Sequence, residues 1–187
     1  MTLEPEKETT MQARGPLMIE HRLIEQMIAL IRGALSQIQT TGKIDPHFVD
    51  AAVDFIRIYA DRTHHGKEED ILFHYLEGKP LSEGDRRVMN ELIQEHRFGR
   101  QTTRALVEAN TRYRRGETTA LTAIAEQLGA LVDFYPKHIA KEDRVFFPAS
   151  RTYFTADEDR AILAEFGEFD RRMIHEKYRS VVEGLKA

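Results

Sequence analysis

The chain has 187 residues, of which 41% are hydrophobic and 31% are charged, and its formal net charge is −4. A chain of this length buries a sizeable core as one domain, and its mixed charges do not predict a nucleic-acid-binding surface. Cysteine is absent, so a metal site would use nitrogen and oxygen ligands. No apolar run reaches the ~20 residues that span a bilayer, and the polar N-terminus is unlike a signal peptide. We therefore expect a soluble, cytoplasmic protein with no membrane partner.

Five helices are predicted, because apolar side chains recur at steps of three and four residues between glycine and proline breaks. They cover about residues 17–41, 46–77, 82–115, 121–147 and 155–185. Ser82 with Asp85, and Thr155 with Glu158, have the spacing of N-terminal capping boxes. Pro136 lies inside the fourth helix, and its missing N–H is expected to bend that helix. No segment has the alternating pattern of a strand.

Long helices joined by short turns pack as antiparallel neighbours. We therefore predict an all-α fold, namely an up-down-up-down four-helix bundle with an additional C-terminal helix. Residues 1–14 are expected to form a flexible tail, residues 15–148 the bundle, and residues 149–187 a helical extension that packs on it. Pro148 is expected to close the fourth bundle helix.

A motif with a histidine and, one helical turn later, a glutamate occurs twice in the chain. The first copy lies in the sequence HHGKEEDILF and the second in HIAKEDRVFF. Each copy is preceded, at nearly equal distance, by a Glu-His-Arg tripeptide, so the two halves of the chain share one design. The histidines and glutamates of this repeat are His21, His64, Glu68, His96, His138 and Glu142.

These six side chains fall on the apolar stripes of the predicted helices, so they should face the interior of the bundle. Four imidazoles and two carboxylates exceed the needs of one ion and are sufficient for two, with iron favoured and manganese or zinc as alternatives. Buried glutamates without cations would be costly or would become protonated. A single His-xxx-Glu pair is usually a surface ion pair, but two matched copies favour a metal site over a metal-free helical scaffold.

The pattern H…HxxxE…H…HxxxE on four long helices resembles the hemerythrin family, in its bacterial and archaeal branch of HHE cation-binding domains. The resemblance covers about residues 17–148. It implies two iron ions, bridged by Glu68 and Glu142 and by an oxo or hydroxo group, that bind dioxygen, peroxide or nitric oxide for sensing, storage or detoxification. The alternatives are a peroxidase-like or nitric-oxide-reducing enzyme, and an iron or redox sensor that acts through metal-dependent folding.

Two positions differ from the oxygen-carrying hemerythrins. Their third helix carries HxxxH, whereas here Arg100 stands four residues after His96. The missing imidazole favours chemistry on a bound oxidant over reversible carriage. Their fourth helix uses HxxxxD, and here Asp143 stands at that offset, but we favour Glu142 because it repeats the spacing of the first copy.

The neighbours of the motif residues are expected to lie outside the site. His65 is rotated by about 100 degrees from the preceding histidine, so we expect it to face a helix seam or water, or to support a ligand histidine. Glu20 and Glu95 are expected to point elsewhere and to pair with surface bases. His175 and Tyr178, three residues apart on the C-terminal helix, are candidates for an additional ligand.

Overall fold

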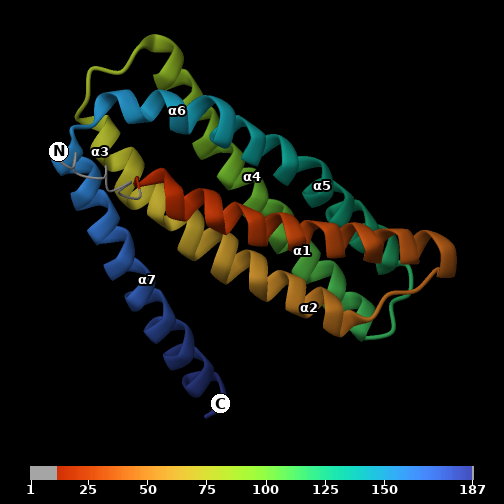
Figure 1. The fold of residues 1–187 in the computed structure, drawn as a ribbon. Coiled ribbons are helices and arrows are strands. Elements are labelled where there is room, and N and C mark those ends of the chain that lie inside the picture. The colour runs from red at the N-terminus through yellow and green to blue at the C-terminus, as the bar shows by residue number, and fades with distance from the viewer. Residues whose placement is uncertain (1–11, 187) are drawn as a thin grey trace, which may run out of the picture.

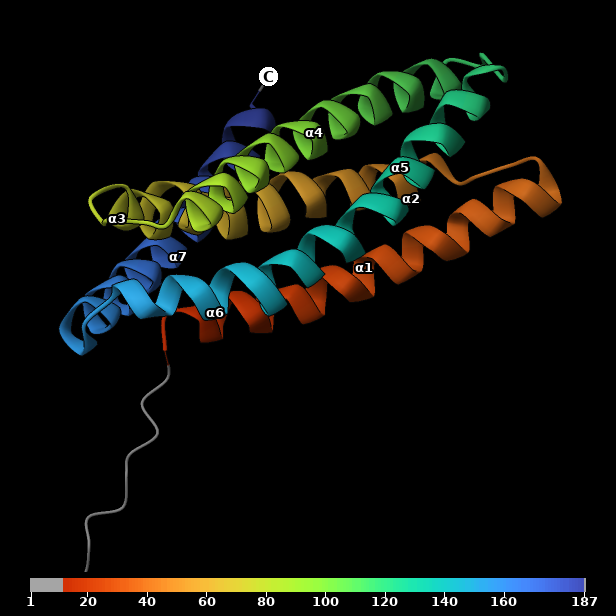
Figure 2. The same cartoon turned by 90° about the horizontal axis from the view of Figure 1, so that it is seen from above.

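The computed structural model describes residues 12–186, which form helices joined by short turns (Figure 1). Four helical stretches form an antiparallel bundle, and a last long helix crosses it at an angle (Figure 2). The predicted all-α bundle with an additional C-terminal helix is confirmed, and residues 12–186 contain no strand. Residues 1–11 of the predicted tail lie outside the described part of the chain.

The bundle and the helix that crosses it are divided into the following elements in chain order. These are α1 (Arg14–Thr41), α2 (Pro46–Phe55), η1 (Ile56–His65), η2 (Glu68–Phe73), α3 (His74–Glu77), α4 (Glu83–Arg114), α5 (Ala120–Lys141), η3 (Glu142–Phe146), α6 (Phe147–Ser150), η4 (Arg151–Tyr153) and α7 (Ala156–Gly184). Three of them, η1, η2 and η3, are π-helical, and η4 is a short 3-10 helix. None of the helices within residues 12–186 is long and apolar enough to cross a membrane.

The π-helical segments coincide with the two His-xxx-Glu motifs. In a π-helix the backbone N–H groups bond to carbonyls five residues earlier, and such wide turns are frequent at functional sites. The Thr63 hydroxyl follows the same spacing, since it donates to the carbonyl of Ile58 at 2.8 Å. The periodicity of the sequence predicts uniform helices and did not reveal these segments.

Most helix ends follow the predicted signals. At Ser82 only half of the predicted capping box forms, since its side chain accepts from the backbone N–H of Asp85 but its own N–H donates to Tyr153. Gly42 ends α1 with a φ of 66°, a left-handed conformation that glycine adopts without strain. Thr155 and Glu158 form a complete capping box at the start of α7. Pro148 does not close the fourth bundle helix as predicted. It lies in the first turn of α6, which directly follows η3, and the helical path continues into η4.

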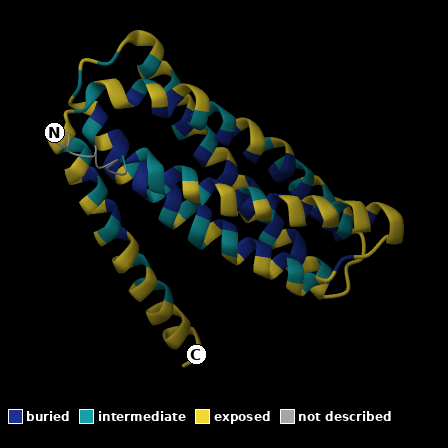
Figure 3. Cartoon of the chain, in the orientation of Figure 1, coloured by how far each residue is buried: buried dark blue, intermediate teal, exposed yellow. Residues whose placement is uncertain are grey.

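Buried side chains form two separate hydrophobic clusters along the bundle. One fills the end where α1 joins α2 and α4 joins α5, and it includes Ile31 and Leu106. The other fills the opposite end, between α3, α6 and α7, and it includes Leu92 and Phe166. Figure 3 shows that the fully buried residues of α7 lie in its first half. The second half lies on the surface of the bundle, where Glu176 pairs with Arg62 and Lys177 with Asp54. A layer of buried histidines and glutamates lies between the two clusters.

Candidate metal centre

The structure brings the six predicted residues together inside the bundle. None of their side chains is more than 2% exposed. They come from every bundle helix: His21 from α1, His64 from η1, Glu68 from η2, His96 from α4, His138 from α5 and Glu142 from η3. The inward orientation that the apolar stripes predict is therefore confirmed for all six side chains.

The potential ligand atoms form two groups, within each of which all atoms lie no more than 4.8 Å apart. The first group contains His21, His64, Glu68 and Glu142. The second group contains His65, Glu68, His96 and His138. Glu68 belongs to both, so the groups adjoin.

Glu142 also reaches both groups. Its Oε2 atom lies 3.1 Å from Nε2 of His21, and its Oε1 atom lies 3.1 Å from Nε2 of His138. Asp143, the alternative at the next position, lies outside the cluster and accepts a hydrogen bond from Nδ1 of His21 at 2.8 Å. The structure therefore places Glu142 at the centre of the site and Asp143 behind one of its histidines.

Glu68 has the same arrangement from the opposite helix. Its Oε1 atom lies 3.6 Å from Nε2 of His64, and its Oε2 atom lies 3.3 Å from Nε2 of His96. Each glutamate thus presents one oxygen to each group. Carboxylates placed in this way between facing helices are typical bridging ligands of dinuclear sites in helical bundles.

Each predicted histidine is held by a carboxylate, and each carboxylate by a cation. The Nδ1 atom lies 2.6–2.9 Å from a carboxylate oxygen in all four cases. The four chains are His21–Asp143–Arg22, His64–Glu20–Lys67, His96–Glu69–Arg100 and His138–Glu95–Lys141. Metal-ligating histidines commonly donate their second nitrogen to a carboxylate in this way, which fixes the ring and the tautomer.

His65 is a fifth histidine of the site, which corrects the expectation that it faces a seam or water. Its side chain is 2% exposed, and its ring stacks on that of His96 with centroids 3.9 Å apart. Its Nδ1 lies 3.4 Å from Asp61, which in turn accepts a hydrogen bond from Arg100 at 2.7 Å. His65 therefore has a longer version of the same histidine–carboxylate–cation chain. The only sequence signal for it was the His-His doublet.

Arg100 stands where the oxygen-carrying hemerythrins have a second histidine, and it lies outside the cluster. Its guanidinium donates to Asp61 and to Glu69, with both distances at 2.7 Å. These two carboxylates are the partners of His65 and His96. Arg100 thus orients two histidines instead of replacing one, and His65 brings the number of clustered imidazoles to five.

Most of the nitrogen and oxygen atoms that face the centre lack hydrogen-bond partners. This holds for Nε2 of His65, His96 and His138 and for both oxygens of Glu68 and Glu142. Because each Nδ1 faces a carboxylate, a neutral ring carries its N–H on Nδ1 and a lone pair on Nε2. The Nε2 atoms of His21 and His64 lie only 2.9 Å apart, so two lone pairs would repel each other unless a cation or proton lies nearby. Buried lone pairs of nitrogen and oxygen that converge in this way fit metal ions.

The carboxylates of the cluster stabilise positive charge on His21, whereas His65 remains neutral. Burial lowers the pKa of His21, but the carboxylates of Asp143 and Glu142 beside its two ring nitrogens outweigh it and raise that pKa to about 10. Burial raises the pKa of Glu142, but the charge of His138 and the hydrogen bond with His21 hold it well below its usual value. Burial and the neighbouring imidazoles lower the pKa of His65 well below its usual value. The glutamate is therefore an anion at neutral pH, and His65 offers an unprotonated lone pair.

Other residues near the motif differ from the expectations. Glu20 and Glu95, expected to pair with surface bases, accept hydrogen bonds from His64 and His138 as described above. Lys67, which the sequence did not single out, is fully buried and pairs with Glu20 and with Asp170 of α7 at 2.8 Å. Folding thus connects α7 to the site through a lysine, and sequence spacing alone gives no signal of this contact.

The candidates for an additional ligand lie elsewhere. His175 and Tyr178 are exposed on the second half of α7, and neither belongs to the two groups of potential ligand atoms. Tyr178 is 63% exposed. The structure does not support the prediction that either residue reaches the site, because both side chains lie on the exposed side of α7.

A four-helix bundle with a buried cluster of histidines and carboxylates is a common architecture for binding metal ions. The model of the hemerythrin HHE cation-binding domain matches residues 16–150. The chain therefore belongs to the hemerythrin HHE cation-binding family, which confirms the resemblance seen in the sequence.

Similar curated proteins include the uncharacterised protein Mb2018 of Mycobacterium bovis and the uncharacterised proteins MT2051 and Rv1995 of Mycobacterium tuberculosis. Each is 27% identical over 182 residues, which cover 96% of this chain and 69% of the relative. No solved structure gives a significant match.

Proposed function

We propose that this protein holds two iron ions in the buried cluster and binds dioxygen, peroxide or nitric oxide there, for sensing, storage or detoxification. The proposal is carried by the convergence of five imidazoles and two carboxylates whose inward atoms mostly lack hydrogen-bond partners. Imidazole and carboxylate ligands suit iron, and manganese or zinc are alternatives. Bound iron would supply the redox chemistry and the affinity for the small oxidant.

The two groups offer unequal sets of donor atoms. The first provides two imidazoles and the second three, and each receives one oxygen from either glutamate. An ion that takes six ligands would therefore retain more free positions in the first group. The small oxidant is accordingly expected on the side of His21 and His64.

Aromatic side chains pack against the imidazoles of the site. Phe147 is fully buried and stacks on His21 with ring centroids 5.8 Å apart. Phe73 is 2% exposed and stacks on His96 at 6.1 Å. These rings fix the imidazoles from the apolar side, while the carboxylate chains fix them from the polar side, so the donor atoms are held in place before an ion binds.

Metal analysis tests the proposal. Protein purified without oxygen is expected to contain two iron ions per chain by mass spectrometry, and its visible spectrum is expected to change when air is admitted. Glu142→Gln should lower the iron content, whereas His47→Ala, which alters an exposed histidine outside the cluster, should not. A folded wild-type protein that holds no metal after reconstitution would exclude the proposal.

An enzyme that reduces peroxide or nitric oxide at the iron ions is the second candidate. It is favoured by a cavity that reaches His65 from the surface, because a reductant or second substrate needs a place beside the metal. Consumption of many equivalents of peroxide or nitric oxide by the loaded protein would support the enzyme. Binding of one equivalent without turnover would support the sensor or storage role.

A further inference from the structure

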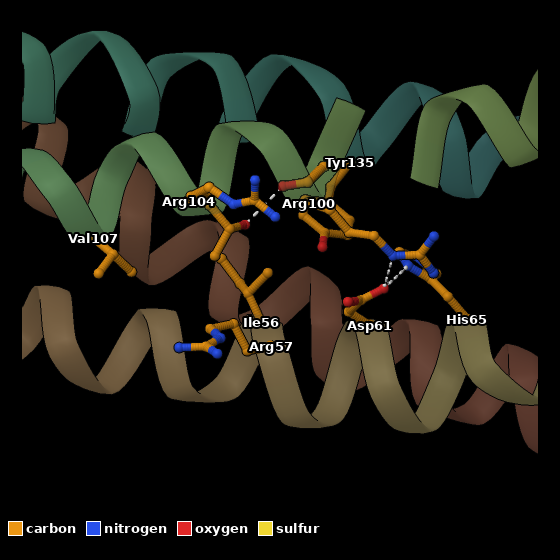
Figure 4. Close-up of a pocket in the computed structure, with 10 residues that line it drawn as sticks. Ile56, Arg57, Asp61, His65, Arg100, Arg104, Val107 and Tyr135 are labelled. Atoms are coloured by element: carbon orange, nitrogen blue, oxygen red, sulfur yellow. Dashed lines mark hydrogen bonds and ion pairs between the residues drawn. The ribbon is translucent and has the colours of Figure 1, made fainter. Parts of the chain in front are cut away.

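A cavity of about 310 Å³ lies beside the second group of the site, between η1, α4 and α5 (Figure 4). Its volume is at the small end of the range for sites that hold small molecules. His65 and Tyr135 form the wall nearest the cluster, and their ring centroids lie 6.5 Å apart. The cavity therefore ends on a side chain that belongs to the candidate metal centre.

Basic side chains dominate the lining of this cavity. Arg57 comes from η1, and Arg100 and Arg104 come from α4, whereas Asp61 is the carboxylate among the lining residues. Arg100 is held by Asp61 and Glu69. Arg57 and Arg104 form no ion pair with any residue in the range 12–186, so two guanidinium groups from different helices remain available to an anion.

The rest of the lining is suited to a short carbon skeleton. Ile56 and Val107 contribute apolar surface, and Gly99 brings the backbone of α4 close to the cavity. Tyr135 is 1% exposed and lines the cavity. Burial raises the pKa of its hydroxyl, which therefore remains a hydrogen-bond donor at neutral pH.

We propose that this cavity binds a small organic anion with a carboxylate head, held by Arg57 and Arg104 beside His65. Guanidinium groups bind carboxylates with paired hydrogen bonds, and the apolar wall accommodates the remainder of the molecule. Asp61 in the same lining disfavours a doubly charged head such as phosphate.

The position of the anion also connects it to the metal centre, and this part of the inference rests on the proposed function. Asp61 lines the cavity and is the carboxylate nearest Nδ1 of His65. A negative charge placed beside Asp61 and Arg100 would change how strongly this pair holds the imidazole. The bound anion would thus be a second substrate or a regulator of the reaction at the iron ions.

Calorimetric titration with benzoate tests the binding site, on both metal-free and metal-loaded protein. We expect one molecule to bind per chain. The double variant Arg57→Gln/Arg104→Gln should bind at least about tenfold more weakly, which equals about 1.4 kcal/mol. Both arginines are exposed and unpaired within the described residues, so the variant should keep its thermal stability. Arg87→Gln, which alters an exposed arginine of α4 outside the cavity, should bind benzoate like the wild type, and neutral benzamide should bind weakly.

Several results would overturn the inference. These are no binding of benzoate, equal binding by the double variant, or tighter binding of inorganic phosphate than of benzoate. In the metal-loaded protein, a benzoate-induced change in the visible spectrum that persists in the double variant would show that benzoate coordinates the metal directly. Because the titration is also made on metal-free protein, it remains decisive if the iron proposal fails. Two iron ions without benzoate binding would remove only the cavity proposal.

Discussion

The substitution Glu95→Gln is expected to weaken metal binding, although Glu95 does not touch the centre of the cluster. Its Oε2 atom lies 2.9 Å from Nδ1 of His138, and Lys141 donates to its Oε1. Glutamine keeps the size of the side chain but removes its charge, so His138 becomes a weaker ligand. A hydrogen bond to a charged group contributes ~1.5–3 kcal/mol. Loss of such a partner typically lowers metal affinity about 10–100-fold, and we expect a loss in this range.

Competition with a chelator of known affinity measures the effect, with bound metal quantified by mass spectrometry. Glu91→Gln provides a matched control on α4, because Glu91 also pairs with Lys141, at 3.2 Å, but contacts no histidine. The control should bind metal like the wild type. Unchanged affinity in Glu95→Gln would refute the role assigned to the carboxylate. An equal loss in both variants would show that the surface charge around Lys141, and not the contact with His138, is responsible.

Three further results are expected. Gly66→Ala should lower the free energy of unfolding by about 1–3 kcal/mol, because the added Cβ would lie 2.7 Å from Cζ of Phe169. Gly33→Ala, with no atom within 4 Å of the new Cβ, should raise it by about 0.5–1 kcal/mol, and equal changes in urea denaturation would contradict the contact. An NMR titration should give Glu158 a pKa of about 2, since the hydrogen bond from Lys79 and those at the helix cap lower it from 4.5. Because this folded-state pKa is depressed, its contribution to stability is present above pH 4.5 and is lost as the pH falls toward 2, whereas a measured value near 4.5 would contradict the contacts. Chelation of the metal should lower the midpoint of thermal unfolding followed by circular dichroism, and an unchanged midpoint would show that the ions do not stabilise the fold.

The bundle and the six repeat residues could be predicted because both depend on local spacing. Steps of three and four residues place apolar side chains on one helix face, and the four-residue spacing of His64 and Glu68 places both on that face. The same reasoning identified Glu142 in preference to its neighbour. Helix periodicity is sufficient wherever the helix is regular and the partner lies on the same face.

His65 was missed because the helix is not regular there. The prediction assumed the rotation of an α-helix, whereas η1 is π-helical up to His65, and its wider turn changes the direction of the side chains. Glu20 and Glu95 were misjudged for a different reason. Each carboxylate accepts a hydrogen bond from a histidine on another helix. The pairing therefore depends on how the helices pack and not on the spacing within either helix.

The polar layer draws between one and three site residues from each bundle helix. It separates the cluster around Ile31 and Leu106 from the cluster around Leu92 and Phe166, so apolar burial holds each end of the bundle but does not span the middle. The buried imidazoles and carboxylates of the middle are costly to desolvate unless opposite charges meet there. In the metal-free chain, protonated His21 beside Glu142 supplies part of that charge. Ions bound to both groups would supply the remainder and would join the four helices directly, because each helical stretch contributes ligands. A variant that removes Glu68 or Glu142 should therefore bind metal more weakly, and its two hydrophobic clusters should unfold less cooperatively.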